Sequence, residues 1–113
     1  MTPSPPEHPV PSARARALVR DAYDTHIHVA PDVVKRRVTD VALARRFAEL
    51  GLAGFGLKSH YTSTAERARV VSEAVPEVDT IGAITLNRAV GGLTRSRSRS
   101  PPARVRGSCG CRP

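Results

Sequence analysis

The sequence contains no tryptophan, and aromatic residues make up only 4% of it. It has no run of about 18 or more apolar residues, which excludes a membrane-spanning helix on hydropathy. The first residues lack the apolar stretch of a secretory signal, so we expect a cytoplasmic protein. The only two cysteines, Cys109 and Cys111, lie one residue apart, which is weak evidence for a disulfide or a metal site.

Acidic residues are missing from one part of the chain. Residues 95–113 contain six arginines and no Asp or Glu, whereas Met1–Thr94 carries twelve Lys or Arg against ten Asp or Glu. The net charge of +8 therefore belongs mainly to the C-terminal tail and not to the rest of the chain. Nucleic acid is not the favoured partner of the domain itself.

The 113 residues leave room for one small domain. Residues 1–20 form a Pro- and Arg-rich leader, expected to be largely disordered apart from a short helix over 13–20. Residues 21–93 carry the apolar patterns of a folded domain. Residues 94–113 form an Arg/Ser-rich tail, expected to be disordered.

The most informative stretch is Tyr23–Asp32, which reads Y-D-T-H-I-H-V-A-P-D. His26 and His28 alternate in strand fashion, so both imidazoles are expected on one face, with Asp24 on the same face one pleat earlier. Pro31 ends the strand because it has no N–H for a ladder. Two imidazoles on one rigid strand suit a divalent transition metal, whereas an exposed polar strand face needs no metal.

The rest of the domain alternates strands with helices. Strands are expected over about 22–29, 52–57 and 78–86, and helices over 39–50 and 64–75, with Gly51 and Pro76 as terminators. This βαβαβ order predicts an α/β fold with a parallel sheet and right-handed crossovers.

Polar side chains gather where each strand is expected to end. They are His26 and His28, then Lys58 and His60, then Asn87 and Arg88. The carboxyl ends of parallel strands share one edge of a sheet, so these residues predict a common site. Asp32 is either a ligand, a substrate contact or, as is commoner after proline, a turn residue.

The tail has three interpretations. It is a phosphorylation-controlled or RNA-binding Arg-Ser segment, a low-complexity disordered tail, or the product of an altered reading frame. We prefer the third interpretation because the orderly α/β pattern stops abruptly at Gly92-Leu93.

These motifs carry a family resemblance over about Tyr23–Leu93. D-T-H-I-H followed by β/α units resembles the first strand of the amidohydrolase superfamily, whose members are distorted (β/α)8 barrels with a divalent metal on the first-strand H-x-H. The longer pattern D-x-H-x-H-x-A-P-D, L-K-S-H and L-N-R-A-V-G-G-L is closest to an uncharacterised bacterial amidohydrolase-like group. A more distant similarity is to the polymerase and histidinol phosphatase (PHP) family, in which T-D-H stands where this chain has Lys58-Ser59-His60.

The resemblance implies metal ligation by His26 and His28, with His60 as a weaker third ligand or a substrate contact. It implies zinc as the metal, with manganese or iron as alternatives. Many amidohydrolases carry a metal-bridging carboxylated lysine on the fourth strand, whereas Lys58 ends the second. Lys58, Asn87, Arg88 and Asp32 are therefore candidate substrate-binding residues, and the catalytic residues are unknown.

The chain covers only the first three strands of such a barrel, because the later-strand ligands and the general base have no counterpart here. We expect the N-terminal part of a metal-dependent hydrolase, acting on an amide, ester or related bond of a small molecule and weakly active or inactive alone. A homo-oligomer or a second chain would cover the open sheet. The alternative is a small α/β binding module whose Arg-Ser tail contacts RNA or another polyanion.

Overall fold

The computed structural model describes residues 10–93 and 104–105. The elements in chain order are α1 (Ala13–Leu18), β1 (Tyr23–Ile27), α2 (Asp40–Leu50), β2 (Gly54–Leu57), α3 (Ala65–Ala74), β3 (Asp79–Ile81), the 3-10 helix η1 (Arg88–Val90) and β4 (Arg104–Val105). Across these ranges, no helix combines the length and the apolarity needed to cross a membrane.

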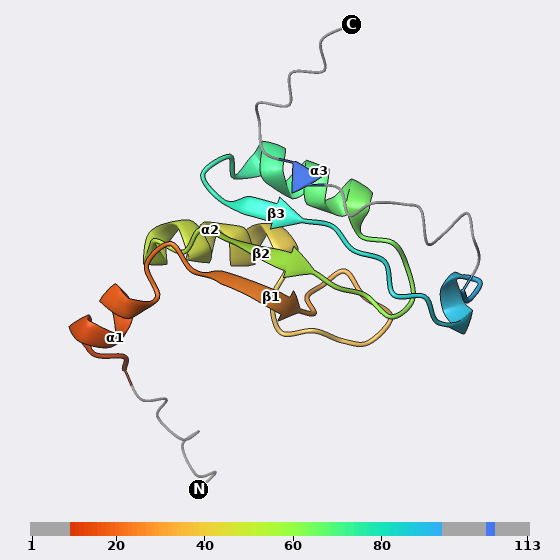
Figure 1. Ribbon diagram of the computed structural model, residues 1–113, viewed down its shortest axis with the longest axis horizontal. Coiled ribbons are helices and arrows are strands. Elements are labelled where there is room, and N and C mark those ends of the chain that lie inside the picture. The colour runs from red at the N-terminus through yellow and green to blue at the C-terminus, as the bar shows by residue number, and fades with distance from the viewer. Residues whose placement is uncertain (1–9, 94–103, 106–113) are drawn as a thin grey trace, which may run out of the picture.

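The strands form one sheet in the order β1-β2-β3-β4. β1, β2 and β3 are parallel, and β4 pairs antiparallel with β3. Because each parallel strand lies beside the next one in the chain, the usual right-handed crossovers put α2 and α3 on the same face of the sheet (Figure 1). The α/β class and the βαβαβ order predicted from the sequence are confirmed.

Helix α2 begins and ends where its sequence predicts. Thr39 is the N-cap, and its side chain accepts a hydrogen bond from the Ala42 N–H at 3.3 Å. Gly51 is the C-cap with φ of 70°, a left-handed conformation that glycine adopts without strain. These two caps fix the length of the helix between β1 and β2.

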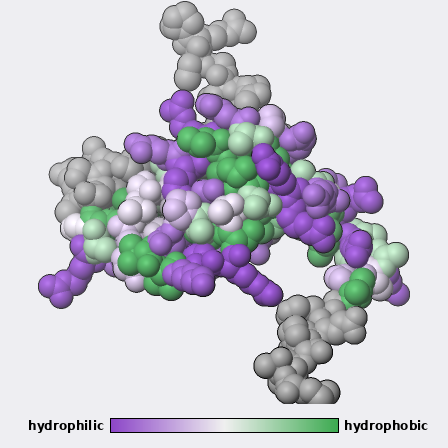
Figure 2. All heavy atoms as spheres, turned by 180° about the vertical axis from the view of Figure 1, so that it is seen from behind, coloured by the Kyte–Doolittle hydropathy of each residue, from purple (hydrophilic) through white to green (hydrophobic). Residues whose placement is uncertain are grey.

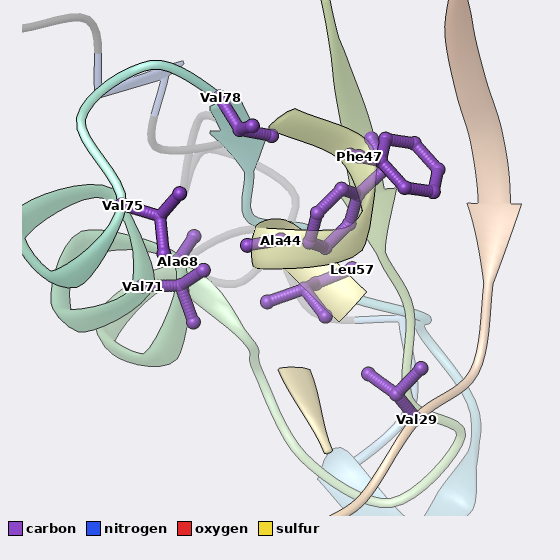
Figure 3. Packing of buried hydrophobic residues seen from close by; sticks show 9 residues of the cluster. Val29, Ala44, Phe47, Leu57, Ala68, Val71, Val75 and Val78 are labelled. Carbon is purple, nitrogen blue, oxygen red and sulfur yellow. The ribbon is translucent and has the colours of Figure 1, made fainter. Parts of the chain in front are cut away.

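The core lies between α2, α3 and the sheet (Figure 3). Its buried members are Val29, Ala44, Phe47, Phe55, Leu57, Ala68, Val71, Val75 and Val78. Both phenylalanines of the chain are in this cluster, where the rings of Phe47 and Phe55 meet edge-on with centroids 5.0 Å apart. Small valines and alanines supply most of the remaining contacts, which explains how a chain with few aromatics builds a core.

Thr64 ties the ends of β2 and β3 together. Its fully buried hydroxyl donates to the Leu57 carbonyl at 2.7 Å and accepts from the Ala83 N–H at 2.8 Å. Its own N–H donates to the Ala83 carbonyl at 2.9 Å. The sequence predicts a helix over 64–75 capped by Thr62 or Ser63, whereas the structure has the helix at Ala65–Ala74 with Thr64 as its N-cap.

The third strand is shorter than predicted. It covers Asp79–Ile81, whereas the apolar pattern extended it to residue 86. At Gly82 the chain passes so close to α3 that a Cβ atom would lie 2.5 Å from Ala65 Cα. The next residue then bonds to Thr64 instead of to a neighbouring strand, so the ladder ends there.

A bulge interrupts β1. The register pairs Asp24 with Phe55 and Ile27 with Leu57, so Thr25 and His26 together oppose the single residue Gly56. The extra residue inverts the alternation of side chains. Asp24 therefore shares the side of Ile27, and its predicted position on the face of His28 is wrong.

The N-terminal segment and the tail add little to the core. α1 is a short helix, as the sequence indicates, but it has no buried residue, and Leu18 remains 77% exposed. Viewed from behind, apolar side chains appear as green patches among polar ones (Figure 2). The expectation that the whole tail lacks structure is wrong at Arg104–Val105, which form β4, and the other residues of 94–113 lie outside the described ranges.

Candidate functional site

The structure brings His26 and His28 together at the carboxyl end of β1. Their Nε2 atoms are 3.3 Å apart, and their ring centroids are separated by 5.3 Å. The bulge supports this arrangement, because the His26 N–H is bonded to the Asp24 carboxylate at 3.0 Å and not to the ladder. Asp24 therefore shapes the backbone that presents the two imidazoles.

His60 joins the pair from the neighbouring strand. Lys58, the first residue after β2, donates its N–H to the Ile27 carbonyl at 2.9 Å, which joins the ends of the two strands. The ring of His60 then stacks on that of His28, with centroids 4.8 Å apart and planes 22° from parallel. The predicted convergence of three imidazoles from two strand ends is confirmed.

The environment of His28 favours the neutral form of its ring. Burial lowers the pKa of His28 below its ordinary value of 6.5, and the nearby charges of His60, Arg36, His26 and Lys58 lower it further. Neutral imidazole is the form that binds a metal ion through its lone pair. The Nδ1 atom of His28 is buried and has no hydrogen-bond partner within the described ranges.

Asp32 lies in the loop that joins β1 to α2. The neck of this loop is closed by the bridge between Ala30 and Thr39, and the Asp40 N–H donates to the Ala30 carbonyl at 3.0 Å. The Asp32 carboxylate accepts from the Val33 N–H at 2.8 Å and forms an ion pair with Arg36 at 2.6 Å. The expected turn role is present, and an ion pair with Arg36 accompanies it.

This ion pair predicts an acid-dependent loss of stability. Burial raises the pKa of Asp32, but the hydrogen bonds from Arg36 and from the Val33 N–H, with the charge of Arg36, bring it below its ordinary value of 3.8. A carboxyl whose pKa is lower in the folded state stabilises the fold above the unfolded-state pKa and loses that effect as pH falls through the folded-state pKa. D32N should therefore cost about 1–3 kcal/mol in urea unfolding at neutral pH, and the difference should fade below pH 3.8.

A matched control is E49Q. Glu49 also pairs with an arginine, Arg46, but both side chains are more than 60% exposed. Removing an exposed pair should cost less than about 0.5 kcal/mol at any pH. A D32N difference that persists unchanged in acid would contradict the assignment.

Two cavities flank the end of β2. One of about 200 Å³ is lined by Thr25, Gly56, Leu57, Lys58, Ile81, Gly82 and Ala83. The other, of about 360 Å³, is lined by Pro31, Asp32, Val33, Ser59, Tyr61, Thr62 and Arg67. Lys58 and Asp32, both predicted as substrate contacts, therefore each line one of these cavities.

Asn87 and Arg88 are not brought to the histidines by any hydrogen bond or ion pair of the described residues. They begin η1, six residues or more beyond the end of β3. The expectation that they end the third strand is wrong, because that strand stops at Ile81. Their role in substrate binding stays a prediction.

The donor set suits part of a metal site. Two nitrogens that share a tetrahedral zinc at 2.0–2.1 Å are about 3.3 Å apart, and the Nε2 atoms of His26 and His28 have this separation. The same separation also fits a hydrogen bond from one ring to the other, with the donor set by the tautomer. In the portion of the chain that the structure describes, no three His, Cys, Asp or Glu side chains form a group that could hold a metal ion. His60 presents a ring face to its neighbour and does not complete such a group.

Two arginines near the site were not singled out from the sequence. Arg36 was one of three consecutive cations, and only its spacing of four from Asp32 marked it as the inward one. Arg67 of α3 donates to the Val29 carbonyl at 3.4 Å and pairs with Asp40 at 3.1 Å. It fixes the residue after His28 to both helices, a contact that only the folded chain reveals.

Comparison with known proteins gives a family match. No curated protein and no solved structure matches the chain. One family model covers residues 21–97, which include β1 to β3, α2, α3 and all three clustered histidines. The chain therefore belongs to the family described as a family of unknown function, DUF6282.

Proposed function

We propose that this chain is the N-terminal part of a metal-dependent hydrolase of the amidohydrolase type, and that His26 and His28 bind the metal. The observation that carries the proposal is the 3.3 Å separation of the two Nε2 atoms at the carboxyl end of a parallel strand. His60 supports it from beyond the end of β2, because its ring stacks on that of His28, and we assign it the weaker role of a third ligand or a substrate contact.

The fold supports the same proposal. Three parallel strands in sequential order, joined by two crossover helices on one face, are the arrangement expected for the first three strands of a (β/α)8 barrel, and this supports the proposal. Barrel enzymes place their active sites at the carboxyl ends of the strands, the edge at which these histidines gather. An oligomer or a second chain that covers the other sheet face remains a prediction.

The residues of the chain would divide the work. His26 and His28 would hold a divalent metal, with zinc first and manganese or iron as alternatives, and the lowered pKa of His28 favours the neutral ligand form. A metal held there would act as a Lewis acid on the carbonyl of an amide or ester. Lys58 and Asp32 would contact the substrate, the latter through its paired Arg36. The general base is unassigned.

The alternative of an RNA-binding module depends on the Arg-Ser tail. Most of that tail lies outside the described residues, so the alternative rests on sequence alone. Deletion of residues 94–113 should abolish salt-sensitive RNA binding if the alternative is correct. It should leave metal binding unchanged if the proposed function is correct.

The test is metal binding by the full chain. Protein treated with a chelator and then titrated with Co²⁺ should bind about one ion per chain, with the absorption bands of a low-symmetry, nitrogen-containing site, and Zn²⁺ should displace it. A well-folded protein that takes up neither ion would refute the proposal.

A further inference from the structure

The smaller cavity lies at the carboxyl ends of β2 and β3, and part of its lining belongs to the sheet face opposite the core. Gly56 pairs in register with Ile81, and both line the cavity, whereas their neighbour Phe55 is buried against the helices. Because Gly56 has no side chain, the cavity is bounded at this position by the backbone of β2 and by Thr25. Gly82 and Ala83 add little bulk at the end of β3. The hollow thus arises from small residues at adjacent strand ends.

The size of the hollow limits what enters it. At about 200 Å³, it is smaller than the roughly 300–1,000 Å³ of pockets that take drug-sized ligands. It suits a small group or a small molecule, and it does not suit a polymer.

Lys58 brings a charge to this cavity. Lys58 is half-buried and lines the hollow, two residues before His60. None of the ion pairs within residues 10–93 involves Lys58. The Asp32 carboxylate is 2% exposed and is already paired with Arg36. The lysine charge is therefore left for a ligand.

We propose that the cavity beside Lys58 binds a small oxyanion, a carboxylate or a phosphate, which forms the anionic end of the substrate of the histidine site. That the anion is part of a substrate rests on the proposed function, whereas the existence of the anion site does not. An ammonium donates charge-assisted hydrogen bonds to such a group, and the half-buried position strengthens them relative to water. The histidines beside it would then face the rest of the molecule.

A competing interpretation assigns anion binding to the three consecutive cations of residues 35–37, in the loop between β1 and α2. Lys35 and Arg37 lie in that loop beside Arg36 and are exposed, and neither lines either cavity. Such charges attract anions weakly and without a fixed position. Lys58 differs because it combines partial burial with a preformed hollow, and the two interpretations predict different variants to be sensitive.

The experiment uses the full chain after chelator treatment, so that no metal contributes. Sodium acetate and inorganic phosphate are titrated separately at low ionic strength, with backbone amide and lysine side-chain NMR shifts as the readout. We expect saturable binding of one of them, with shifts concentrated at Gly56, Lys58 and Gly82. Whether acetate or phosphate binds shows whether the site takes a carboxylate or a phosphate. No saturable binding of either, or shifts confined to residues 35–37, would overturn the proposal.

Variants give a second, independent readout. K58M should weaken the anion affinity by about tenfold or more, whereas K58R, which keeps the cation, and K35M should each leave it within about threefold. An unchanged affinity in K58M would overturn the proposal, and so would an equal loss in K35M. If K58M does not fold, the shift map of the wild type and the K35M result decide instead.

The metal experiment separates this proposal from the proposed function. Saturable anion binding by a chain that takes up no Co²⁺ or Zn²⁺ would support the anion site and refute the proposed hydrolase function. Metal uptake without anion binding would support the proposed hydrolase function and refute the anion site. Equal Zn²⁺ affinity in K58M and wild type would support the assignment of Lys58 to the anion and not to the metal.

Discussion

Replacing His28 with glutamine should weaken Zn²⁺ binding by roughly 100-fold, since losing a ligand costs at least as much as losing one of its outer partners. Glutamine keeps most of the side-chain volume in this half-buried position but is a poor zinc ligand. The remaining imidazole of His26 would hold the ion alone. The measurement is competition against a chromophoric chelator, with circular dichroism to confirm the fold.

The other histidines provide matched controls. H26Q should cost about as much as H28Q, because the two Nε2 atoms hold equivalent positions 3.3 Å apart. The double variant should lose little more than either single one, because the two ligands act as a unit. H60Q should cost about tenfold or less, since that ring stacks on His28. His8, in the Pro-rich leader of residues 1–20, serves as the control, and a loss in H8Q equal to that in H28Q would contradict the site.

The order of elements follows directly from the sequence because its signals are local. Thr39 and Gly51 mark the ends of α2 through their own side-chain and backbone chemistry, and the structure agrees at both ends. The convergence of His28 and His60 follows from the parallel arrangement alone, because carboxyl ends of neighbouring parallel strands share an edge.

The errors arise from long-range contacts. The residues of Tyr23–Ile27 follow the alternating pattern of a regular strand, so no local signal in the sequence predicts the bulge. This bulge turns Asp24 away from His28. Likewise, the apolar run after Ile81 resembles a strand, but the contact of Gly82 with Ala65 ends the ladder. Both features depend on which strand or helix lies next to the chain, and a single sequence does not contain that information.

The ion pair between Arg36 and Asp32 could be predicted from the sequence only in part. Its spacing from Asp32 was visible, but three adjacent cations offered the same charge. The fold selects Arg36 because the bridge between Ala30 and Thr39 closes the loop and buries the Asp32 side chain, which is only 2% exposed. A charged partner is then required at that position and not at its neighbours.

A second long-range contact crosses the open face of the sheet. The Tyr23 hydroxyl donates to the Asp79 carboxylate at 2.8 Å, and these residues come from β1 and β3. Gly54 of β2 stands between them in the register. The Tyr23 ring passes over Gly54. Any side chain at position 54 would occupy the same space as this ring, so the contact requires glycine there.

Replacing Gly54 with alanine should therefore destabilise the protein by roughly 3 kcal/mol or more, at the upper end for overpacked sites. A Cβ atom there would lie 2.1 Å from the Asp79 carbonyl oxygen and 2.7 Å from the Tyr23 ring. The first contact is with backbone of the adjacent strand, so β2 and β3 would have to separate. Urea unfolding at neutral pH measures the loss, which is a large fraction of the 5–15 kcal/mol typical of small domains.

G56A is the matched control on the same strand. A Cβ atom at Gly56 would meet the Thr25 carbonyl oxygen at 3.1 Å, a tight contact that a shift of a few tenths of an ångström relieves. We expect a cost below about 1 kcal/mol there. Equal stability of G54A and G56A would mean that β1, β2 and β3 do not have the register from which the histidine cluster is built. The larger loss in G54A would support both the register and the position of the histidines at the adjoining strand ends.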